Sequence, residues 1–192
     1  GVENIGVKVA TDGREIAFRL EWDDPTVDVG AIRSQDFRDA VALQFPITEG
    51  KPFFGMGEKG RPVNIWHWRS DWQVDAKSRT EVESQYPRVT VAMYPMERNE
   101  VFHTGAGAGN PMSSKKRASP VEDLNATAQG TLTSQAAAGQ DVSGEGAWSS
   151  GRWQVVVRRA LTTSGSADIQ LANRRATPVA FAVWDGAAAD RN

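Results

Sequence analysis

The sequence predicts an all-β protein, an antiparallel β-sandwich with a few short helical turns. Apolar and polar residues alternate with a period of two in several short segments, which is typical of strands with one buried face. Turn residues such as the Asp-Gly pair at 12–13 separate these segments, and helical periodicity is weak throughout. A length of 192 residues suits one domain, which we expect to span residues 1–192.

The expected strands follow one another along the whole chain. In the first of them the side chains of Ile16, Phe18, Leu20 and Trp22 fall on one face of a strand within residues 14–24. The second, within residues 39–46, ends at a proline, which has no N–H to donate to a sheet. The later strands are expected within residues 63–72, 88–95, 130–135, 152–161 and 179–186.

Helical signals are confined to residues 34–40 and 121–128, and the second segment has Glu and Asp near its start. Three other segments break the strand pattern. Residues 51–62 are rich in aromatic side chains and glycine, residues 102–120 are long and rich in Gly, Ser and Pro, and residues 134–151 are expected to be a mobile connection. Long loops in a compact domain are usually functional or disordered.

Composition excludes several classes of site. Without cysteine the chain forms no disulfide, no Cys-ligated iron–sulfur cluster and no covalent c-type haem. The motifs of zinc proteases, P-loop NTPases and α/β-hydrolases are absent. Basic residues are scattered over a chain of formal net charge −2, which argues against a nucleic-acid partner. No apolar run reaches the length of a membrane span, and no export signal opens the sequence.

The stretch at residues 51–72 presents Met56 between two glycines and beside five aromatic side chains. A thioether is a soft ligand suited to haem iron or copper, and glycine lets the backbone approach a planar ligand without a Cβ clash. Alternatively, Met56 fills a gap in the core, as most methionines do. Met112, in the long glycine-rich segment, is a competing ligand. The residues alone leave these possibilities open.

Trp66 and Trp68 share one face of their expected strand, while His67 and Arg69 point to the other face. The two indoles fit the core of a sandwich, the wall of a porphyrin pocket or a platform on which sugars stack. Periodicity alone does not choose among these three roles.

Candidate nitrogen ligands occur in the long glycine-rich segment. Lys115, Lys116 and Arg117 would ordinarily be solvated surface residues, but a lysine whose pKa is lowered by burial can bind iron as the neutral amine. His103 is the more conventional iron ligand by chemistry, and it is equally a candidate surface residue.

Several blocks of the sequence resemble one family in order. They include "EIAFRLEWDD", "PFFGMGEKGRPVNIWHWRSDWQ", "SPVEDLNATAQGTLTS", "GRWQVVVRRAL" and "VAFAVWDGAAADRN". The resemblance is to the haem b-binding γ subunit of periplasmic molybdenum enzymes such as ethylbenzene dehydrogenase, dimethylsulfide dehydrogenase, selenate reductase and chlorate reductase. It extends from about residue 6 to residue 192.

The resemblance implies a β-sandwich that holds one non-covalent haem b between its sheets, similar to the cytochrome domain of cellobiose dehydrogenase. It makes Met56 one axial ligand of the iron. For the second ligand it implies a lysine, for which Lys116 is our prediction, with Lys115, His103 by substitution, or a lysine beyond the last residue as the alternatives. The other residues expected at the haem are the walls Phe54, Trp66 and Trp68 and the propionate partner Arg61, with Arg69 as a second candidate for that role.

The resemblance also implies a function without substrate chemistry of its own. The chain is expected to relay electrons between an iron–sulfur β subunit, which accompanies a molybdopterin-containing α subunit, and a soluble c-type cytochrome in the periplasm. The rival hypothesis is a carbohydrate-binding or structural β-sandwich module without haem, with Met56 in its core.

Overall fold

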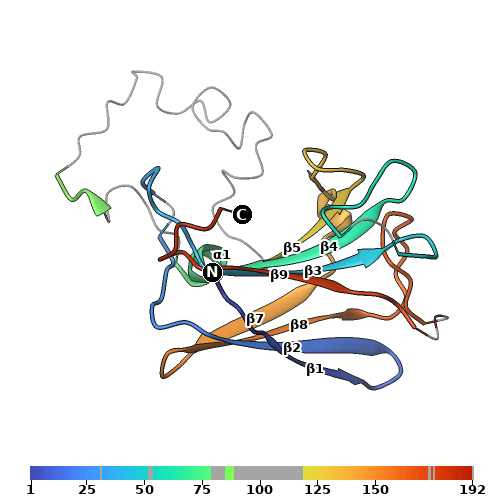
Figure 1. Cartoon of the computed structure of the whole chain (residues 1–192), viewed down its shortest axis with the longest axis horizontal. Helices are drawn as coiled ribbons and strands as arrows, with labels where there is room; N and C mark the ends of the chain where they lie inside the picture. The colour runs from blue at the N-terminus through green and yellow to red at the C-terminus, as the bar shows by residue number, and fades with distance from the viewer. Residues whose placement is uncertain are drawn as a thin grey trace, which may run out of the picture.

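The computed structural model describes residues 1–30, 32–51, 54–78, 85–88, 119–172, 174 and 176–191. Within these residues the chain forms two antiparallel sheets packed face to face, with one short α-helix at one side (Figure 1). The predicted all-β sandwich is therefore confirmed. No helix among the described residues is long and apolar enough to cross a membrane.

The smaller sheet has four strands in the order β1-β2-β8-β7. Its central pair, β2 and β8, runs in continuous antiparallel register along nine residue pairs. The turn between β1 and β2 forms because Asp12 Oδ1 accepts the N–H groups of Arg14 and Glu15, both at 2.8 Å, while Gly13 adopts a φ of 86°. The strands are β1 (Gly6–Thr11), β2 (Glu15–Asp23), β7 (Ser143–Trp148) and β8 (Arg152–Ala160).

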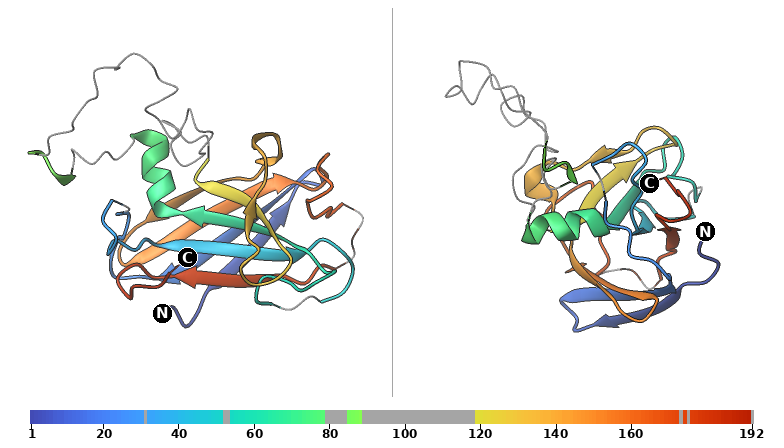
Figure 2. Two further views of the ribbon diagram at one scale, coloured as in Figure 1. Left: turned by 90° about the horizontal axis from the view of Figure 1, so that it is seen from above. Right: turned by 90° about the vertical axis from the view of Figure 1, so that its left-hand side faces the viewer.

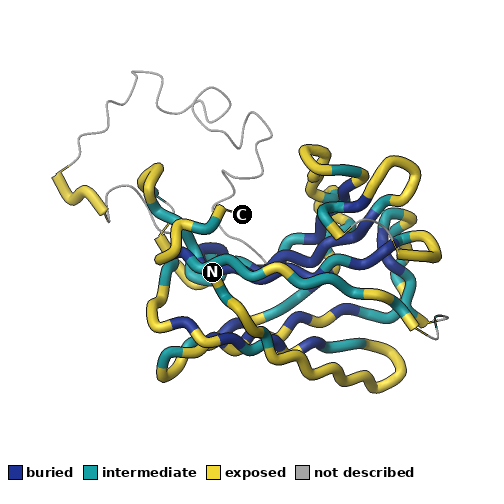
Figure 3. Tube along the Cα trace, viewed as in Figure 1, coloured by how far each residue is buried: buried dark blue, intermediate teal, exposed yellow. Residues whose placement is uncertain are grey.

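The larger sheet has five strands in the order β6-β5-β4-β3-β9. Strands β3 and β4 lie inside this sheet, between β9 and β5 (Figure 2). They are buried on both faces, whereas every residue of β1 in the other sheet is exposed (Figure 3). Because both faces of β3 and β4 are covered, other side chains pack on the outer face of this sheet as well as between the two sheets. The strands are β3 (Ala40–Pro46), β4 (Val63–Arg69), β5 (Val121–Ala126), β6 (Thr133–Ser134) and β9 (Ala180–Trp184).

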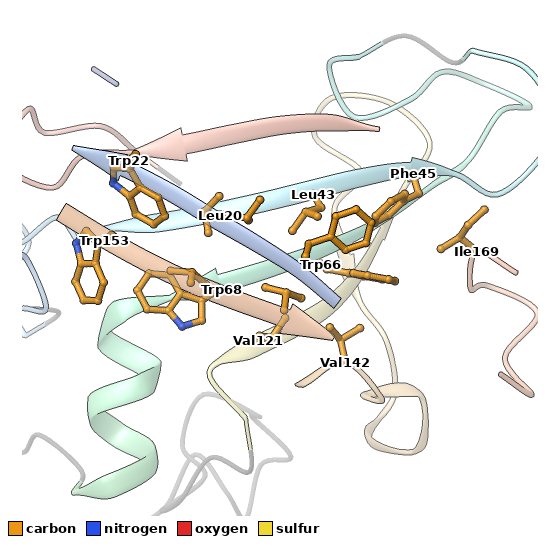
Figure 4. Packing of buried hydrophobic residues seen from close by; sticks show 14 residues of the cluster. Leu20, Trp22, Leu43, Phe45, Trp66, Trp68, Val121, Val142, Trp153 and Ile169 are labelled. Atoms are coloured by element: carbon orange, nitrogen blue, oxygen red, sulfur yellow. The ribbon is translucent and has the colours of Figure 1, made fainter. Parts of the chain in front are cut away.

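The space between the sheets is filled by aromatic and branched side chains (Figure 4). The indoles of Trp22 and Trp153 stack with ring centroids 6.3 Å apart, and the ring of Phe45 lies 4.6 Å from that of Trp66. The alternating apolar residues predicted for the first strand all belong to β2, and three of them, Phe18, Leu20 and Trp22, are buried in this core. The core cluster consists of Phe18, Leu20, Trp22, Val41, Leu43, Phe45, Trp66, Trp68, Val121, Val142, Trp153, Val155, Val157 and Ile169.

The helical elements differ from those predicted. Residues 121–126 form β5 rather than a helical turn, because pairing with β4 satisfies their backbone groups and buries Val121, Leu124 and Ala126. Residues 34–40 contain no helix, but a single turn begins the segment, in which the N–H of Asp36 donates to the carbonyl of Arg33 at 3.0 Å. Helix α1 (Ser70–Lys77) forms within a region predicted to continue as strand. Asp71 in its first turn and Lys77 in its last turn complement its dipole.

Two further predictions concern residues 134–151 and the strand expected at residues 88–95. Residues 134–151 are not simply a mobile connection, because they contain the 3₁₀ turn η2 (Ala137–Gly139) and strand β7, which pairs with β8. The strand expected at residues 88–95 lies outside the described residues except for Arg88.

Candidate functional site

The outer face of the five-stranded sheet, which points away from the other sheet, carries an apolar cluster of its own. Along β4 the side chains alternate, so that Trp66 and Trp68 point into the sandwich while Ile65 and His67 point outward. The same alternation applies to β3 and β5, whose outward residues are mostly small or aliphatic. We call the following residues the outer cluster: Ala42, Val63, Ile65, Leu124 and Ala126, with Met56 and Trp184 packed against them.

Met56 reaches this cluster from the connection between β3 and β4. Its φ of 72° lies in the left-handed region, which is uncommon for a residue other than glycine. The side chain of Gln44 fixes the turn from both sides: its Nε2 donates to the carbonyl of Phe54 at 3.0 Å, and its Oε1 accepts the N–H of Met56 at 3.1 Å. The half-buried thioether side chain is thus held against the outer face of the sheet.

Gly57 has a packing reason to be glycine. Its φ is 74°, and a Cβ added there would lie 2.9 Å from the carbonyl oxygen of Arg61 and 3.2 Å from Cγ1 of Val63. The sequence suggested that glycine beside Met56 admits a planar ligand. The structure shows that Gly57 first of all lets the connection fold tightly back onto the start of β4.

The two predicted wall residues on β4 lie on the face opposite to Met56. Trp66 donates through Nε1 to Asn64 Oδ1 at 3.0 Å, and Trp68 donates through Nε1 to Gln73 Oε1 at 3.1 Å. Both indoles are fully buried between the sheets. The structure therefore places them in the core of the sandwich and does not bring them together with Met56.

Phe54 and Arg61 lie at the surface of the connection that carries Met56. Phe54 is 76% exposed and, with Gln44 and Ala180, lines an open groove of about 190 Å³ at the edge of the outer face. Arg61 pairs with Glu58, with 3.4 Å between Nη1 and Oε1, and both side chains are about half exposed. Arg61 is accessible to an anionic partner, and the ion pair with Glu58 contributes little because water screens it.

The predicted nitrogen ligands Lys115, Lys116 and His103, and the competing ligand Met112, lie outside the described residues. Arg69, the second candidate for a propionate, is engaged within the chain. Its guanidinium contacts both carboxylate oxygens of Asp71 at 3.2 and 3.3 Å and lies 4.7 Å from the ring of Trp72.

His67 is a residue of the outer face that sequence reasoning did not select. Its side chain is only 7% exposed, and its ring lies 5.2 Å from that of Trp184. The pKa of His67 is lowered to about 3, chiefly by burial and also by the charges of Arg69 and Arg38, so the imidazole is neutral at ordinary pH. Its Nε2 has no hydrogen-bond partner in the described part of the chain.

A neutral imidazole with a free nitrogen is the form of histidine that accepts a proton or binds a metal. The period-two pattern around Trp66 and Trp68 already assigned His67 to the other face of the strand. Its burial could not be read from that pattern, because it depends on what covers the outer face. On that face His67 lies between Ala42 on β3 and Glu122 on β5, the residues with which it pairs in the two neighbouring strands.

Comparison with known proteins shows similarity along the full chain. A family model described as "Ethylbenzene dehydrogenase" matches residues 1–192. The chlorate reductase subunit gamma of Ideonella dechloratans is 28% identical over 188 residues, covering 96% of this chain and 56% of that protein. The dimethylsulfide dehydrogenase subunit gamma of Rhodovulum sulfidophilum is 29% identical over 191 residues, covering 99% of this chain and 56% of that protein.

A third relative, from Haloferax mediterranei, carries the provisional name respiratory nitrate reductase heme subunit ORF7. It is 26% identical over 192 residues, which are all of this chain and 52% of that protein. The chain thus spans just over half the length of the curated relatives that it matches. Because the family model covers every residue, this chain belongs to the ethylbenzene dehydrogenase family.

Proposed function

We propose that this chain is an electron-transfer subunit that holds one haem b at the outer face of the five-stranded sheet, with Met56 as an axial ligand. The observation that carries the proposal is the methionine side chain packed on the outer cluster, on a backbone turn that Gln44 fixes by two hydrogen bonds. The name of the Haloferax mediterranei relative, a heme subunit, supports the same cofactor.

The outer face is favoured over the space between the sheets for two reasons. The described residues between the sheets pack against one another as a continuous aromatic core, so a haem there would have to displace them. Met56, by contrast, packs against the outer cluster and not against the core cluster, among the residues that the structure describes. We therefore propose a location that differs from the one that the resemblance implies.

The residues of this face fit a haem. A bound haem supplies a one-electron couple at its iron. The thioether of Met56 is a soft ligand of the kind that raises a haem potential, and the aliphatic outer cluster would exclude water from one side of the ring. Arg61 is accessible for a propionate, and exposed Phe54 lies on the same connection as Met56.

For the second axial ligand we retain Lys116, with Lys115 and His103 as alternatives. An amine ligand must be neutral, which requires burial to lower its pKa. The structure adds His67 to the candidates, because it is neutral, buried and on the same face as Met56.

We further propose that the haem exchanges electrons with an iron–sulfur β subunit, which accompanies a molybdopterin-containing α subunit, and with a soluble c-type cytochrome in the periplasm. Two relatives are named as gamma subunits of a chlorate reductase and a dimethylsulfide dehydrogenase, which supports membership of a multisubunit oxidoreductase.

The carbohydrate-binding alternative has no support from Trp66 and Trp68. A sugar platform needs exposed, coplanar rings, and both of these indoles are fully buried in the core.

The haem proposal is tested on the full-length protein by absorption spectra, oxidised and then dithionite-reduced, followed by acid–acetone extraction. We expect a low-spin b-type spectrum and extractable haem. Met56→Ala should change the reduced spectrum because the iron loses its thioether, and the matched control Met112→Ala should not. A colourless protein that fails to take up added haemin contradicts the proposal, and a spectral change in Met112→Ala alone assigns the ligand to Met112.

The second ligand is identified by the same spectra in Lys116→Ala, Lys115→Ala, His103→Ala and His67→Gln. Acid should release a lysine ligand as the amine takes up a proton. A low-spin spectrum that persists in Lys116→Ala and is lost in His67→Gln would reject Lys116.

A further inference from the structure

Two groups of three carboxylates come together in the structure, and they differ in charge balance. In each group one oxygen of every member lies within 4.8 Å of the others; the groups are Asp24, Asp39 and Asp185, and Asp123, Asp141 and Asp168. A buried carboxylate is costly unless a cation or several hydrogen bonds compensate its charge.

The second group contains its own cation. The guanidinium of Arg159, fully buried, lies 3.8 Å from Asp123, 3.9 Å from Asp141 and 3.7 Å from Asp168. Gln135 also donates through Nε2 to Asp123 at 3.0 Å and to Asp168 at 2.7 Å. Oδ2 of Asp123, like Oδ2 of Asp24, is buried without a hydrogen-bond partner among the described residues, but the guanidinium of Arg159 supplies this group with a counter-charge from within the chain.

The first group has no such partner. Within the residues that the structure describes, no lysine, arginine or histidine nitrogen lies within 4.0 Å of the carboxylates of Asp24, Asp39 and Asp185. Asp24 is 1% exposed and Asp39 is fully buried, whereas Asp185 is partly exposed. Three acids are thus gathered at one point without a counter-charge.

Hydrogen bonds from the chain orient all three carboxylates, but they leave one oxygen of Asp24 without a donor among the described residues. Asp39 accepts the N–H of Asp28 at 2.8 Å, Nε1 of Trp153 at 3.0 Å and the N–H of Gly186 at 3.0 Å. Asp24 accepts the N–H of Thr26 at 3.0 Å and the Thr26 hydroxyl at 3.2 Å, both through Oδ1. Asp185 accepts the N–H of Ala188 at 3.1 Å, also through Oδ1.

The Oδ2 atom of Asp24 is buried and has no hydrogen-bond partner among the residues that the structure describes. A buried carboxylate oxygen without a donor, beside two further carboxylates, is what an oxygen-binding cation would leave when it is removed.

The surrounding backbone is built to hold the three acids together. Asp24 follows β2, Asp39 precedes β3 and Asp185 follows β9, so the group joins the two sheets at one end of the sandwich (Figure 1). Gly186 makes the approach possible, because a Cβ there would lie 2.4 Å from Cβ of Asp28 and 2.7 Å from the carbonyl oxygen of Phe37.

We propose that Asp24, Asp39 and Asp185 form a calcium site that fastens the end of the sandwich. Oxygen ligands alone select a hard cation, and Ca²⁺ tolerates an irregular set of carboxylates completed by water, which can enter beside Asp185. Mg²⁺ is a weaker candidate because it demands regular octahedral geometry and keeps most of its water. The inference is independent of haem binding.

The first test is terbium luminescence on EDTA-treated full-length protein. Tb³⁺ replaces Ca²⁺ in oxygen sites, and the indoles of Trp153 and Trp148, which donate to Asp39 and to the carbonyl of Asp24, are close enough to sensitise it. We expect saturable emission that Ca²⁺ displaces and the same concentration of Mg²⁺ does not. Absence of saturable emission, or equal displacement by Mg²⁺, overturns the assignment.

The second test uses Asp24→Asn, with Asp23→Asn as the matched control because Asp23 is exposed and paired with Arg152. Asp24→Asn should weaken Tb³⁺ binding about tenfold or more, since affinity follows ligand charge. In EDTA the melting temperature of Asp24→Asn should equal or exceed that of the unmodified protein, because one of three like charges is removed. With excess Ca²⁺ the unmodified protein should have the higher melting temperature.

A purely structural role for Asp24 would instead lower the melting temperature equally with and without calcium, and that result rejects the site. Asp185→Asn, at the partly exposed member, provides the same comparison if Asp24→Asn does not fold. Asp23→Asn should behave as the unmodified protein in both conditions, and a loss of calcium response in this control would place the ion elsewhere.

Discussion

At the scale of single residues, Met56 has the most unusual backbone of the candidate site. A residue other than glycine with φ near 72° carries a conformational cost of about 1–3 kcal/mol. The two hydrogen bonds from Gln44 and the packing of the side chain on the outer cluster offset that cost. Strain that the surroundings enforce at one residue is typical of ligand-binding positions, which agrees with the role proposed for Met56.

The neighbouring glycines provide a prediction at this scale. Gly57 and Gly60 have similar φ values of 74° and 81°. A Cβ added at Gly57 would overlap with the carbonyl oxygen of Arg61, whereas a Cβ added at Gly60 would have no atom within 4 Å among the described residues. Gly60→Ala should therefore lower the free energy of unfolding by about 1–2 kcal/mol, the cost of the left-handed backbone alone. Gly57→Ala should lose about 1–3 kcal/mol more from the steric overlap. Urea unfolding of both variants measures the difference, and equal losses would contradict the steric argument.

At the scale of elements, glutamine amides take the place of missing strand partners. The side chain of Gln73 on α1 accepts the N–H of Gly146 and donates to its carbonyl on β7, and it also accepts Nε1 of Trp68. Gln140 does the same for the N–H and carbonyl of Asp123 on β5, at 2.8 and 2.9 Å. An amide has one donor and one acceptor side, so it satisfies both groups of an edge residue as a paired strand would.

Replacement of Gln73 by leucine tests this role. Gln73→Leu keeps a side chain of similar size but leaves the Gly146 backbone groups and Trp68 Nε1 without these partners, which should lower the free energy of unfolding by about 1–3 kcal/mol. The control Gln154→Leu lies on the exposed face of β8 and should change it by about 0.5 kcal/mol or less. Guanidinium unfolding compares the two, and the interpretation fails if both variants match the unmodified protein.

At the scale of the whole molecule, a buried ionic network connects the sheets. Arg159 on β8 donates through Nη1 to Asn64 on β4 at 3.1 Å and faces Asp123 on β5. Its guanidinium also lies 4.7 Å from the ring of Trp66. The pKa of Asp123 is raised to about 7, chiefly by burial and also by the charges of Asp168 and Asp141. The hydrogen bond from Asn64 and the charge of Arg159 act in the opposite direction.

This pKa predicts a pH dependence of stability. An aspartate in the unfolded chain ionises near 3.8, so between pH 3.8 and about 7 the folded protein binds more protons at Asp123. The stabilising contribution of Asp123 to the free energy of unfolding is therefore fully present below pH 3.8. It is lost as the pH rises to about 7, by at most about 1.4 kcal/mol per pH unit.

Asp123→Asn removes this titration while it retains the shape of the side chain. As the pH rises from 4 to 7, the unmodified protein should lose unfolding free energy through this titration, whereas the variant should not. The stability of the variant relative to the unmodified protein should therefore increase with pH. Urea unfolding at several pH values in this window measures it. A difference that is constant with pH would show that Asp123 stays ionised in the folded state.

The period-two pattern of the sequence correctly predicted the class of fold and which residues of a strand share a face. Ile16, Phe18, Leu20 and Trp22 follow this pattern in β2. The pattern failed at residues 121–126, where tertiary pairing with β4 outweighed a local helical signal from Pro120 and the acidic residues after it. It could not find α1 either, because the helix begins where β4 pairing ends and its buried contacts come from distant elements.

By itself the sequence determined the alternation of the strands, the absence of cysteine chemistry and the choice of Met56 as a candidate ligand, since these are properties of residue type and local spacing. Only the tertiary structure decided that Met56 lies on the face opposite Trp66 and Trp68, that His67 is buried, and that Asp24, Asp39 and Asp185 meet. The reason is that such contacts join residues far apart in the chain. They depend on the order in which strands pair, such as β9 beside β3, which no local periodicity encodes.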